Sequence, residues 1–189
     1  IVDDLFFELV RLASEIRPRV VVAENVAGLT KGKAAGYLRE FLRAFRKAGY
    51  VPEARVVDCS WLGIPQTRTR LVILAVRDDI AGAGVLPSFP APYPQRATLA
   101  EAIALPDVPQ RYGPIYDPET GEDISLVPRY AVGREWEKLR PGQQSARYFQ
   151  LVRSHPKKPV GTMTATAGQV GAASVTHPTE PRKFTVPEV

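Results

Sequence analysis

The distribution of proline constrains the fold of this chain more than any other feature of its sequence. The 189 residues include 18 prolines, of which only Pro18, Pro52 and Pro65 precede residue 87. Because proline lacks a backbone N–H and has a fixed φ, it is disfavoured inside helices and central strands. The sequence therefore predicts regular structure up to about residue 86 and a largely irregular backbone after it.

Composition excludes several classes of protein. The chain is 44% hydrophobic and 24% charged, which is ordinary for a globular protein and argues against general disorder. No apolar run approaches the roughly 18 residues that a membrane-spanning helix needs. The single cysteine excludes an internal disulfide and a thiolate zinc site made by this chain alone. We expect a reduced, cytoplasmic protein, and its net charge of +5 permits a polyanionic partner.

The first 77 residues have the periodicities of alternating helices and strands. In chain order, the predicted elements are a helix over residues 5–16, a strand at 20–23, a helix over 38–45, and strands at 55–58 and 71–76. Pro18 ends the first helix, and Gly49 caps the second. The apolar run at 20–23 is continuous, which is typical of a strand that is buried on both faces and central in its sheet.

This order of elements is that of the second half of an open α/β sheet. A central strand needs a neighbour on each side, and nothing earlier in the chain supplies one for residues 20–23. We therefore expect a further segment before residue 1 to complete the sheet.

Glu24 is the first candidate catalytic residue. It follows the apolar strand, at the end where open α/β sheets bind their ligands. A carboxyl group there is expected to be partly desolvated, so that it is protonated near neutral pH and donates to a ring nitrogen. The alternative is an ordinary strand-end glutamate that pairs with Lys31 or Lys33.

A second candidate site lies at residues 63–70, which read Gly-Ile-Pro-Gln-Thr-Arg-Thr-Arg. Alternation predicts that Arg68 and Arg70 lie on the same face as the chain enters a strand. Two adjacent guanidinium groups repel each other unless an anion or a carbonyl-rich ligand lies between them, and a phosphate or a base carbonyl fits that role. The alternative is a solvated strand end with exposed arginines.

Both stretches resemble motifs of the cytosine-specific (C-5) DNA methyltransferases. Residues 18–29, Pro-Arg-Val-Val-Val-Ala-Glu-Asn-Val-Ala-Gly-Leu, resemble the family's Glu-Asn-Val region, and residues 63–70 resemble its Pro-Gln-x-Arg-x-Arg motif. Three later similarities follow in the family's order: residues 135–153 resemble the end of its target-recognition region, residues 155–165 its ninth motif, and residues 177–188 the segment that leads into its tenth.

The resemblance implies an α/β fold. The fold would be a partial Rossmann-like sheet of an S-adenosylmethionine-dependent methyltransferase, with a small irregular, β-containing target-recognition domain. Residues 1–86 would form the C-terminal half of the catalytic domain, residues 87–155 the recognition region, and residues 156–189 the end of that region and the return to the catalytic domain. The implied function is that of a bacterial restriction-modification DNA (cytosine-5-)-methyltransferase. It flips a cytosine out of double-stranded DNA and transfers a methyl group from S-adenosylmethionine to carbon 5.

The resemblance also implies roles for individual residues. Glu24 would hydrogen-bond or protonate N3 of the flipped cytosine, and Asn25 would orient the loop. Arg70 would contact the cytosine O2, and Arg68 the neighbouring phosphate or the active-site scaffold. Thr162 and Thr164 would help to organise the recognition domain. The implied DNA-binding residues are Gln66, Arg68, Lys157, Lys158, Thr162 and Thr164.

Two parts of the family's machinery are missing from the sequence. The family's nucleophile lies in a Pro-Cys dipeptide upstream of Glu-Asn-Val, whereas Cys59 lies downstream and is predicted to be structural. The Phe-x-Gly-x-Gly cofactor loop is absent too, so no cofactor-binding residue is assigned here. No metal site is predicted, because His155 and His177 lack ligand spacing with Cys59. We expect the isolated chain to be inactive and to need an N-terminal catalytic segment, in cis or in trans.

Two alternatives to this interpretation remain. In the first, the chain is a non-catalytic DNA-binding module or one subunit of a split methyltransferase. In the second, it belongs to an enzyme that methylates cytosine in RNA. RNA is the less favoured substrate, because the proline-rich recognition region resembles the DNA enzymes better.

Overall fold

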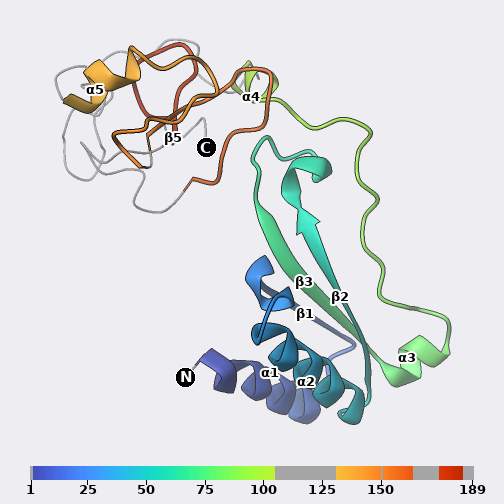
Figure 1. Cartoon of the computed structure of the whole chain (residues 1–189). Coiled ribbons are helices and arrows are strands. Elements are labelled where there is room, and N and C mark those ends of the chain that lie inside the picture. The colour runs from blue at the N-terminus through green and yellow to red at the C-terminus, as the bar shows by residue number, and fades with distance from the viewer. Residues whose placement is uncertain (1, 105–130, 150, 164–174, 185–189) are drawn as a thin grey trace. The chain divides into compact units, whose positions relative to one another are not determined.

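The computed structural model describes residues 2–104, 131–149, 151–163 and 175–184. The chain divides into two compact units (Figure 1). The first, called the sheet unit, comprises Ile1–Asp58 and Thr69–Ala91. The second, called the loop unit, comprises Cys59–Arg68 and Pro92–Val189.

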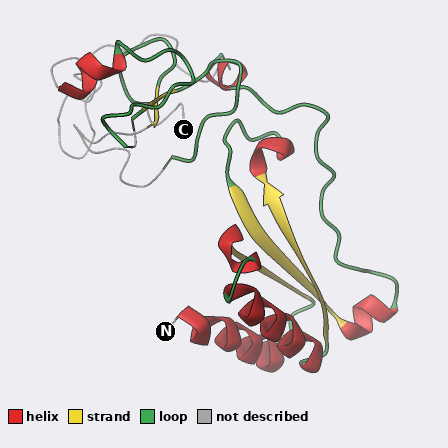
Figure 2. Ribbon diagram, in the orientation of Figure 1, coloured by secondary structure: helices red, strands yellow, loops and turns green. Residues whose placement is uncertain are grey.

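The sheet unit is built on three strands, β1 (Val20–Val26), β2 (Tyr50–Asp58) and β3 (Thr69–Arg77). Their order in the sheet is β1-β3-β2, and β3 is antiparallel to both neighbours (Figure 2). The middle strand is the last in the sequence, so β1 and β2 run in the same direction on either side of it. A short helix, α3 (Asp78–Gly82), follows β3.

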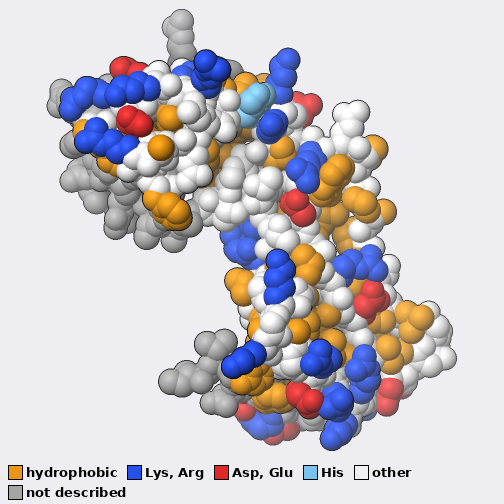
Figure 3. Space-filling model, in the orientation of Figure 1, with side chains coloured by type: hydrophobic (Ala, Val, Ile, Leu, Met, Phe, Trp, Pro, Cys, Tyr) orange, Lys and Arg blue, Asp and Glu red, His pale blue; other side chains and the backbone are white. Residues whose placement is uncertain are grey.

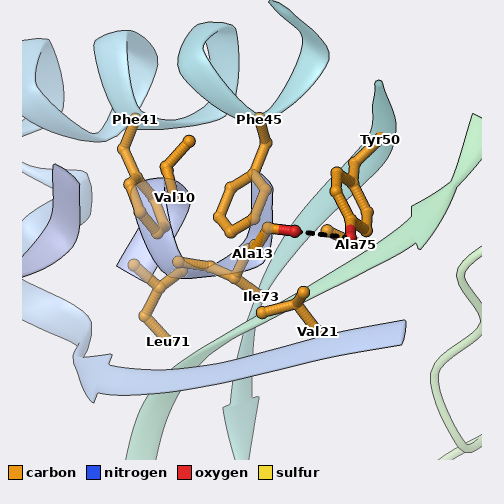
Figure 4. Packing of buried hydrophobic residues seen from close by; sticks show 9 residues of the cluster. All are labelled: Val10, Ala13, Val21, Phe41, Phe45, Tyr50, Leu71, Ile73 and Ala75. Atoms are coloured by element: carbon orange, nitrogen blue, oxygen red, sulfur yellow. Dashed lines mark hydrogen bonds between the residues drawn. The ribbon is translucent and has the colours of Figure 1, made fainter. Parts of the chain in front are cut away.

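Helices α1 (Val2–Ile16) and α2 (Ala34–Lys47) lie side by side over one face of this sheet (Figure 1). The core between helices and sheet consists of Val10, Ala13, Val21, Phe41, Phe45, Tyr50, Leu71, Ile73 and Ala75 (Figure 4). Phe41 and Phe45 are 1% and 0% exposed, and their rings meet edge to face with centroids 4.9 Å apart. Burial of aromatic area of this kind is the largest stabilising contribution in a small core.

The ends of both helices lie where the sequence predicts them. Arg17, directly before Pro18, has φ 53°, and its N–H donates to the Ala13 carbonyl at 2.9 Å. After α2, Gly49 has φ 82°, the left-handed conformation that favours glycine. The predicted helix–strand–helix–strand–strand order and the mixed α/β class are therefore confirmed.

The prediction that the first strand is buried on both faces is wrong for the residues that the structure describes. Val21 is 7% exposed, but Val20, Val22 and Val26 are 49%, 64% and 57% exposed. The helices cover one face only, so successive side chains of β1 alternate between core and surface. In the described sheet β1 pairs with β3 alone and forms an edge, so its predicted central position still depends on a neighbour from a further segment.

The described part of the loop unit has little regular structure, as its prolines predict. Its described elements are the 3-10 turn η2 (Cys59–Leu62), α4 (Leu99–Ile103), α5 (Ala131–Trp136), β4 (Val152–Arg153) and β5 (Val175–Thr176), the two strands being parallel. Within the described chain, no helix is both long and apolar enough to cross a membrane.

Hydrogen bonds connect the small apolar clusters of the loop unit. The buried Trp136 indole donates to the Thr176 hydroxyl at 2.7 Å, and that hydroxyl donates to the Val152 carbonyl at 2.9 Å. The Arg153 guanidinium lies 4.0 Å from the centroid of the Trp136 ring and donates to the Leu139 carbonyl. These side-chain contacts reinforce the short β4–β5 pair and join α5 to it.

We expect Tyr50→Phe to destabilise the sheet unit by about 1–2 kcal/mol. The buried Tyr50 hydroxyl lies 3.1 Å from the Ala13 carbonyl and 2.9 Å from that of Pro18, so it ties the end of α1 to β2 (Figure 4). Urea unfolding followed by far-UV circular dichroism measures the loss, since α1 and α2 dominate the helical signal. Tyr37→Phe, at an exposed position on α2, is the matched control and should change stability by less than about 0.5 kcal/mol.

Lys183 should make the loop unit less stable as the pH falls. Its Nζ is buried without a hydrogen-bond partner among the described residues, and burial lowers the pKa of the ammonium below its ordinary value of 10.5. The unfolded chain then binds the proton more tightly, so stability rises with pH in the interval between the lowered pKa and 10.5. We expect Lys183→Met to stabilise the unit at pH 7 by about 1–3 kcal/mol and to reduce this slope. Urea unfolding followed by tryptophan fluorescence at pH 7 and pH 9.5 measures the change of stability with pH. If this change is the same in Lys183→Met and in the wild type, Lys183 is not its cause.

Candidate functional site

Glu24 and Arg70 form an ion pair at one end of the sheet. The Arg70 Nε lies 2.6 Å from the Glu24 Oε1. In the register of β1 and β3, Glu24 is opposite Val72 and Val26 is opposite Arg70, so the two charged residues are diagonal neighbours on one face. The structure thus brings together the two residues that the sequence singled out in separate motifs.

The surroundings of Glu24 differ from the expectation in two ways. Its side chain is 56% exposed, so the predicted partial desolvation is not found in the described structure. Its partner is Arg70, not Lys31 or Lys33. Arg70 is the more buried member, with 19% of its side chain exposed, and it also donates to the Thr69 carbonyl at 2.9 Å. The cation is therefore held by two acceptors, while the carboxylate keeps an open side.

A pocket of about 310 Å³ lies between α1 and the end of β1 within the sheet unit. Its lining consists of Leu5, Phe6 and Leu9 from α1 and Ala23, Glu24 and Asn25 from β1. Glu24 and Asn25 are the polar residues of this lining, and the other four are apolar. The backbone N–H of Val26 donates a hydrogen bond to the Asn25 Oδ1, with a donor–acceptor distance of 2.8 Å. This bond orients the Asn25 side chain at the end of β1.

Arg68 lies outside the strand that carries Arg70. β3 begins at Thr69, so the two arginines do not share a strand face as expected. Arg68 belongs to the loop of residues 59–68, which opens with a 3-10 turn, η2 (Cys59–Leu62), and is part of the loop unit. The loop is closed at its base by the Cys59 N–H, which donates to the Arg68 carbonyl at 3.0 Å.

Residues 65–67 of this loop pair with residues 160–162. The Val160 N–H donates to the Pro65 carbonyl at 2.7 Å, and the Thr67 N–H donates to the Val160 carbonyl at 2.8 Å. The Thr162 hydroxyl donates to the Thr67 carbonyl at 2.6 Å. Gln66 and Thr162, both predicted to bind DNA, are therefore neighbours within the loop unit.

The remaining sequence candidates occupy simpler positions. Lys157 and Lys158 are exposed in a turn, and Thr164 lies outside the described residues. Cys59 is a free, partly buried thiol. In the described part of the chain, no group of three or more His, Cys, Asp or Glu side chains could hold a metal ion.

The structure adds contacts that sequence reasoning missed. Arg96 lies over the Trp61 ring, 4.6 Å from its centroid, and the Tyr93 N–H donates to the Trp61 carbonyl at 2.7 Å. Trp61 stands directly beside a recognised motif, but nothing in the proline-rich sequence around Tyr93 pointed to its partner.

The fold and the candidate site both point to an α/β enzyme that binds its ligand at the end of the sheet. A carboxylate–guanidinium pair stands at the end of a strand in an α/β sheet, which is where open sheets of this kind bind ligands. The family model described as C-5 cytosine-specific DNA methylase matches residues 2–189, and the chain belongs to that family.

Curated relatives agree with this assignment. The chain is 37% identical over 141 residues to the type II methyltransferase M.Eco47II of Escherichia coli, covering 71% of this chain and 33% of that protein. It is 33% identical over 159 residues to the type II methyltransferase M.XorII of Xanthomonas oryzae, covering 83% and 32%. The chain thus spans about a third of the length of these relatives.

Solved structures share the fold. A DNA modification methyltransferase encoded within an Escherichia coli prophage superposes with a TM-score of 0.65 at 20% identity, covering 98% of this chain and 62% of that one. A Spodoptera frugiperda DNMT2 mutant gives 0.51 at 15% identity, covering 90% and 44%. These neighbours are methyltransferases, which confirms the predicted fold class.

We expect the Glu24–Arg70 pair to contribute little to folding. Its carboxylate is more than half exposed, and exposed pairs are typically coupled by only about 0.2–1 kcal/mol. A double-mutant cycle of Glu24→Gln and Arg70→Gln, measured by urea unfolding with far-UV circular dichroism, checks this. A coupling above about 2 kcal/mol would instead identify the pair as a structural element.

Proposed function

We propose that this chain is the part of a DNA (cytosine-5-)-methyltransferase that activates the target base and contacts the DNA around it. The observation that carries the proposal is the ion pair between Glu24 and Arg70, which combines the family's Glu-Asn-Val and Pro-Gln-x-Arg-x-Arg motifs in one place. Membership of the family supports the reaction class.

The chemistry of cytosine fits these two side chains. N3 and the O2 carbonyl are adjacent on one edge of the ring, so a carboxyl group and a guanidinium group held side by side match that edge. Glu24 holds or delivers a proton at N3, and Arg70 donates to O2. Both contacts draw electron density from the ring and make carbon 6 more electrophilic. Because one Glu24 edge is open in the described structure, a flipped base has access to it.

The methyl donor in this proposal is S-adenosylmethionine, but the described residues do not fit its main binding site. The pocket beside Glu24 has one acidic side chain and no glycine-rich turn. We therefore assign the donor and the cysteine nucleophile to another segment of the enzyme, supplied in cis or in trans, and expect this chain alone to be inactive.

The free edge and exposed face of β1 support such a segment. In the described sheet β1 pairs only with β3, which leaves a row of backbone donors and acceptors along its other side. Val20, Val22 and Val26 add an exposed apolar row on one face. A further strand paired with β1, with structure covering these valines, would bury both.

DNA contacts in this proposal come from the loop unit. Gln66, Arg68, Lys157, Lys158 and Thr162 are its candidate residues, with Thr164 outside the described part. Lysine and arginine side chains are spread over the visible face of each unit, not gathered in one patch (Figure 3).

The test combines this chain with a segment that carries the nucleophile and the cofactor loop, supplied in cis or in trans, and assays methyl transfer with tritiated S-adenosylmethionine. We expect 5-methylcytosine in duplex DNA, and Glu24→Gln and Arg70→Ala should each lower the chemical rate about 10²–10⁴-fold with little change in DNA affinity. Glu53→Gln is the matched control, since Glu53 forms an exposed pair with Arg55 at 2.9 Å on the same sheet.

Three outcomes would overturn the proposal. Methyl transfer by the 189-residue chain alone would show that the catalytic machinery had been misassigned. Large losses of DNA binding at normal turnover would contradict the roles of Glu24 and Arg70. Activity on tRNA but not on duplex DNA would make RNA the substrate.

A further inference from the structure

The loop of residues 59–68 is supported on a second side, by residues 92–96. The Tyr93 N–H donates to the Trp61 carbonyl at 2.7 Å, one of the shorter backbone hydrogen bonds of the loop unit. The two residues are far apart in the sequence, so this bond closes a long segment onto the loop. The first support, the pairing with residues 160–162, lies on the part of the loop that follows Ile64.

The Tyr93 side chain adds a steric contact at Gly63. Gly63 has φ 87°, a conformation that side chains rarely adopt. A Cβ at this position would also lie 3.1 Å from the Tyr93 Cε2. The backbone conformation therefore favours glycine, and a larger residue here would also force the Tyr93 ring to shift by a few tenths of an ångström.

Arg96 provides a third contact. Its guanidinium carbon lies 4.6 Å from the centroid of the Trp61 ring, within cation–π range. Trp61 is 37% exposed, so the pair lies at the surface of the loop unit. Backbone, ring and cation contacts thus all join residues 92–96 to residues 61–63.

Prolines make the supporting segment stiff. Residues 90, 92 and 94 are proline, which fixes φ at alternate positions on both sides of Tyr93. A segment restricted in this way loses less conformational entropy when it docks than a flexible one. The tyrosine is therefore presented to Gly63 at low entropic cost.

We propose that Tyr93 and Arg96 are positioning residues that hold the loop of residues 59–68 in its DNA-binding conformation. They act through Gln66 and Arg68 and do not themselves touch the reacting base. The inference rests on the proposed function in one respect, namely that this loop binds DNA. The loop's order is a separate property that is measured without DNA.

The first measurement is amide hydrogen exchange of the 189-residue chain by NMR, read at Thr67 and Val160. Tyr93→Ala should accelerate exchange at both amides about tenfold, while Tyr93→Phe, which keeps the ring, should match the wild type. Gly63→Ala should also accelerate exchange at both amides. In the double variant Gly63→Ala, Tyr93→Ala the acceleration should be smaller than the sum of the two single effects, because the new Cβ no longer meets the Tyr93 ring. Tyr37→Ala, on exposed α2 surface, should leave these amides unchanged.

The second measurement is binding to a fluorescein-labelled DNA duplex as a function of salt. Arg68→Ala should weaken binding and reduce the salt slope by about one. Tyr93→Ala should weaken binding about three- to tenfold in the wild type and by clearly less in Arg68→Ala, where only its effect through Gln66 remains. That non-additivity distinguishes a positioning residue from one with a merely structural role.

The outcomes separate the two proposals. If the wild-type chain does not bind duplex DNA, the proposed function fails. If the wild-type chain binds DNA and Arg68→Ala weakens binding but Tyr93→Ala does not, the positioning role of Tyr93 fails. Unchanged exchange in Tyr93→Ala also overturns the positioning role, whatever DNA binding shows.

Discussion

The pairing of β1 with β3 is the interaction on which the sheet unit and its candidate site depend. Leu71, Ile73 and Ala75 on β3 face the helices and are almost fully buried. Because side chains alternate along a strand, a slip of one residue would exchange these for Arg70 and Val72. The core therefore fixes the register, and the register places Arg70 diagonal to Glu24. An ion pair that contributes little to stability thus owes its geometry to apolar packing on the opposite face of the sheet.

The connection between β2 and β3 serves both units. The chain leaves the sheet at Asp58, forms the loop of residues 59–68 in the loop unit, and returns at Thr69. Arg68 and Arg70, two residues apart, therefore have different structural contexts. Arg70 is held by strand pairing and by Glu24, whereas the position of Arg68 depends on loop contacts, from the base at Cys59 to the pairing with residues 160–162. In the proposed enzyme, Arg70 is therefore held rigidly enough to contact the flipped base, and Arg68 lies in a loop that contacts the DNA backbone.

Local features of the sequence predicted the elements of the sheet unit well. Pro18 and Gly49 act through their own backbone geometry, so the helix ends could be read directly. The burial of β1 could not, since a run of four apolar residues looks alike in a central strand and in a strand with one exposed face. The sequence could not predict the ion-pair partner of Glu24 either. Lys31 and Lys33 are near Glu24 in sequence, but strand pairing brings Arg70 into contact with it. Within the site, motifs identified the residues, while distances came only from the fold.

The prolines that divide the chain have two physical effects. In the described part of the loop unit regular strands are limited to the short β4–β5 pair, and the side chains of Trp136, Arg153 and Thr176 add contacts around it. Around Tyr93 the same residue type stiffens the chain, and a stiff segment can support a neighbouring loop without being a helix or strand. Periodicity reveals neither effect, because both depend on contacts between residues distant in sequence. In residues 90–96, fixed φ angles and contacts with residues 61–63 therefore order the chain without any regular secondary structure.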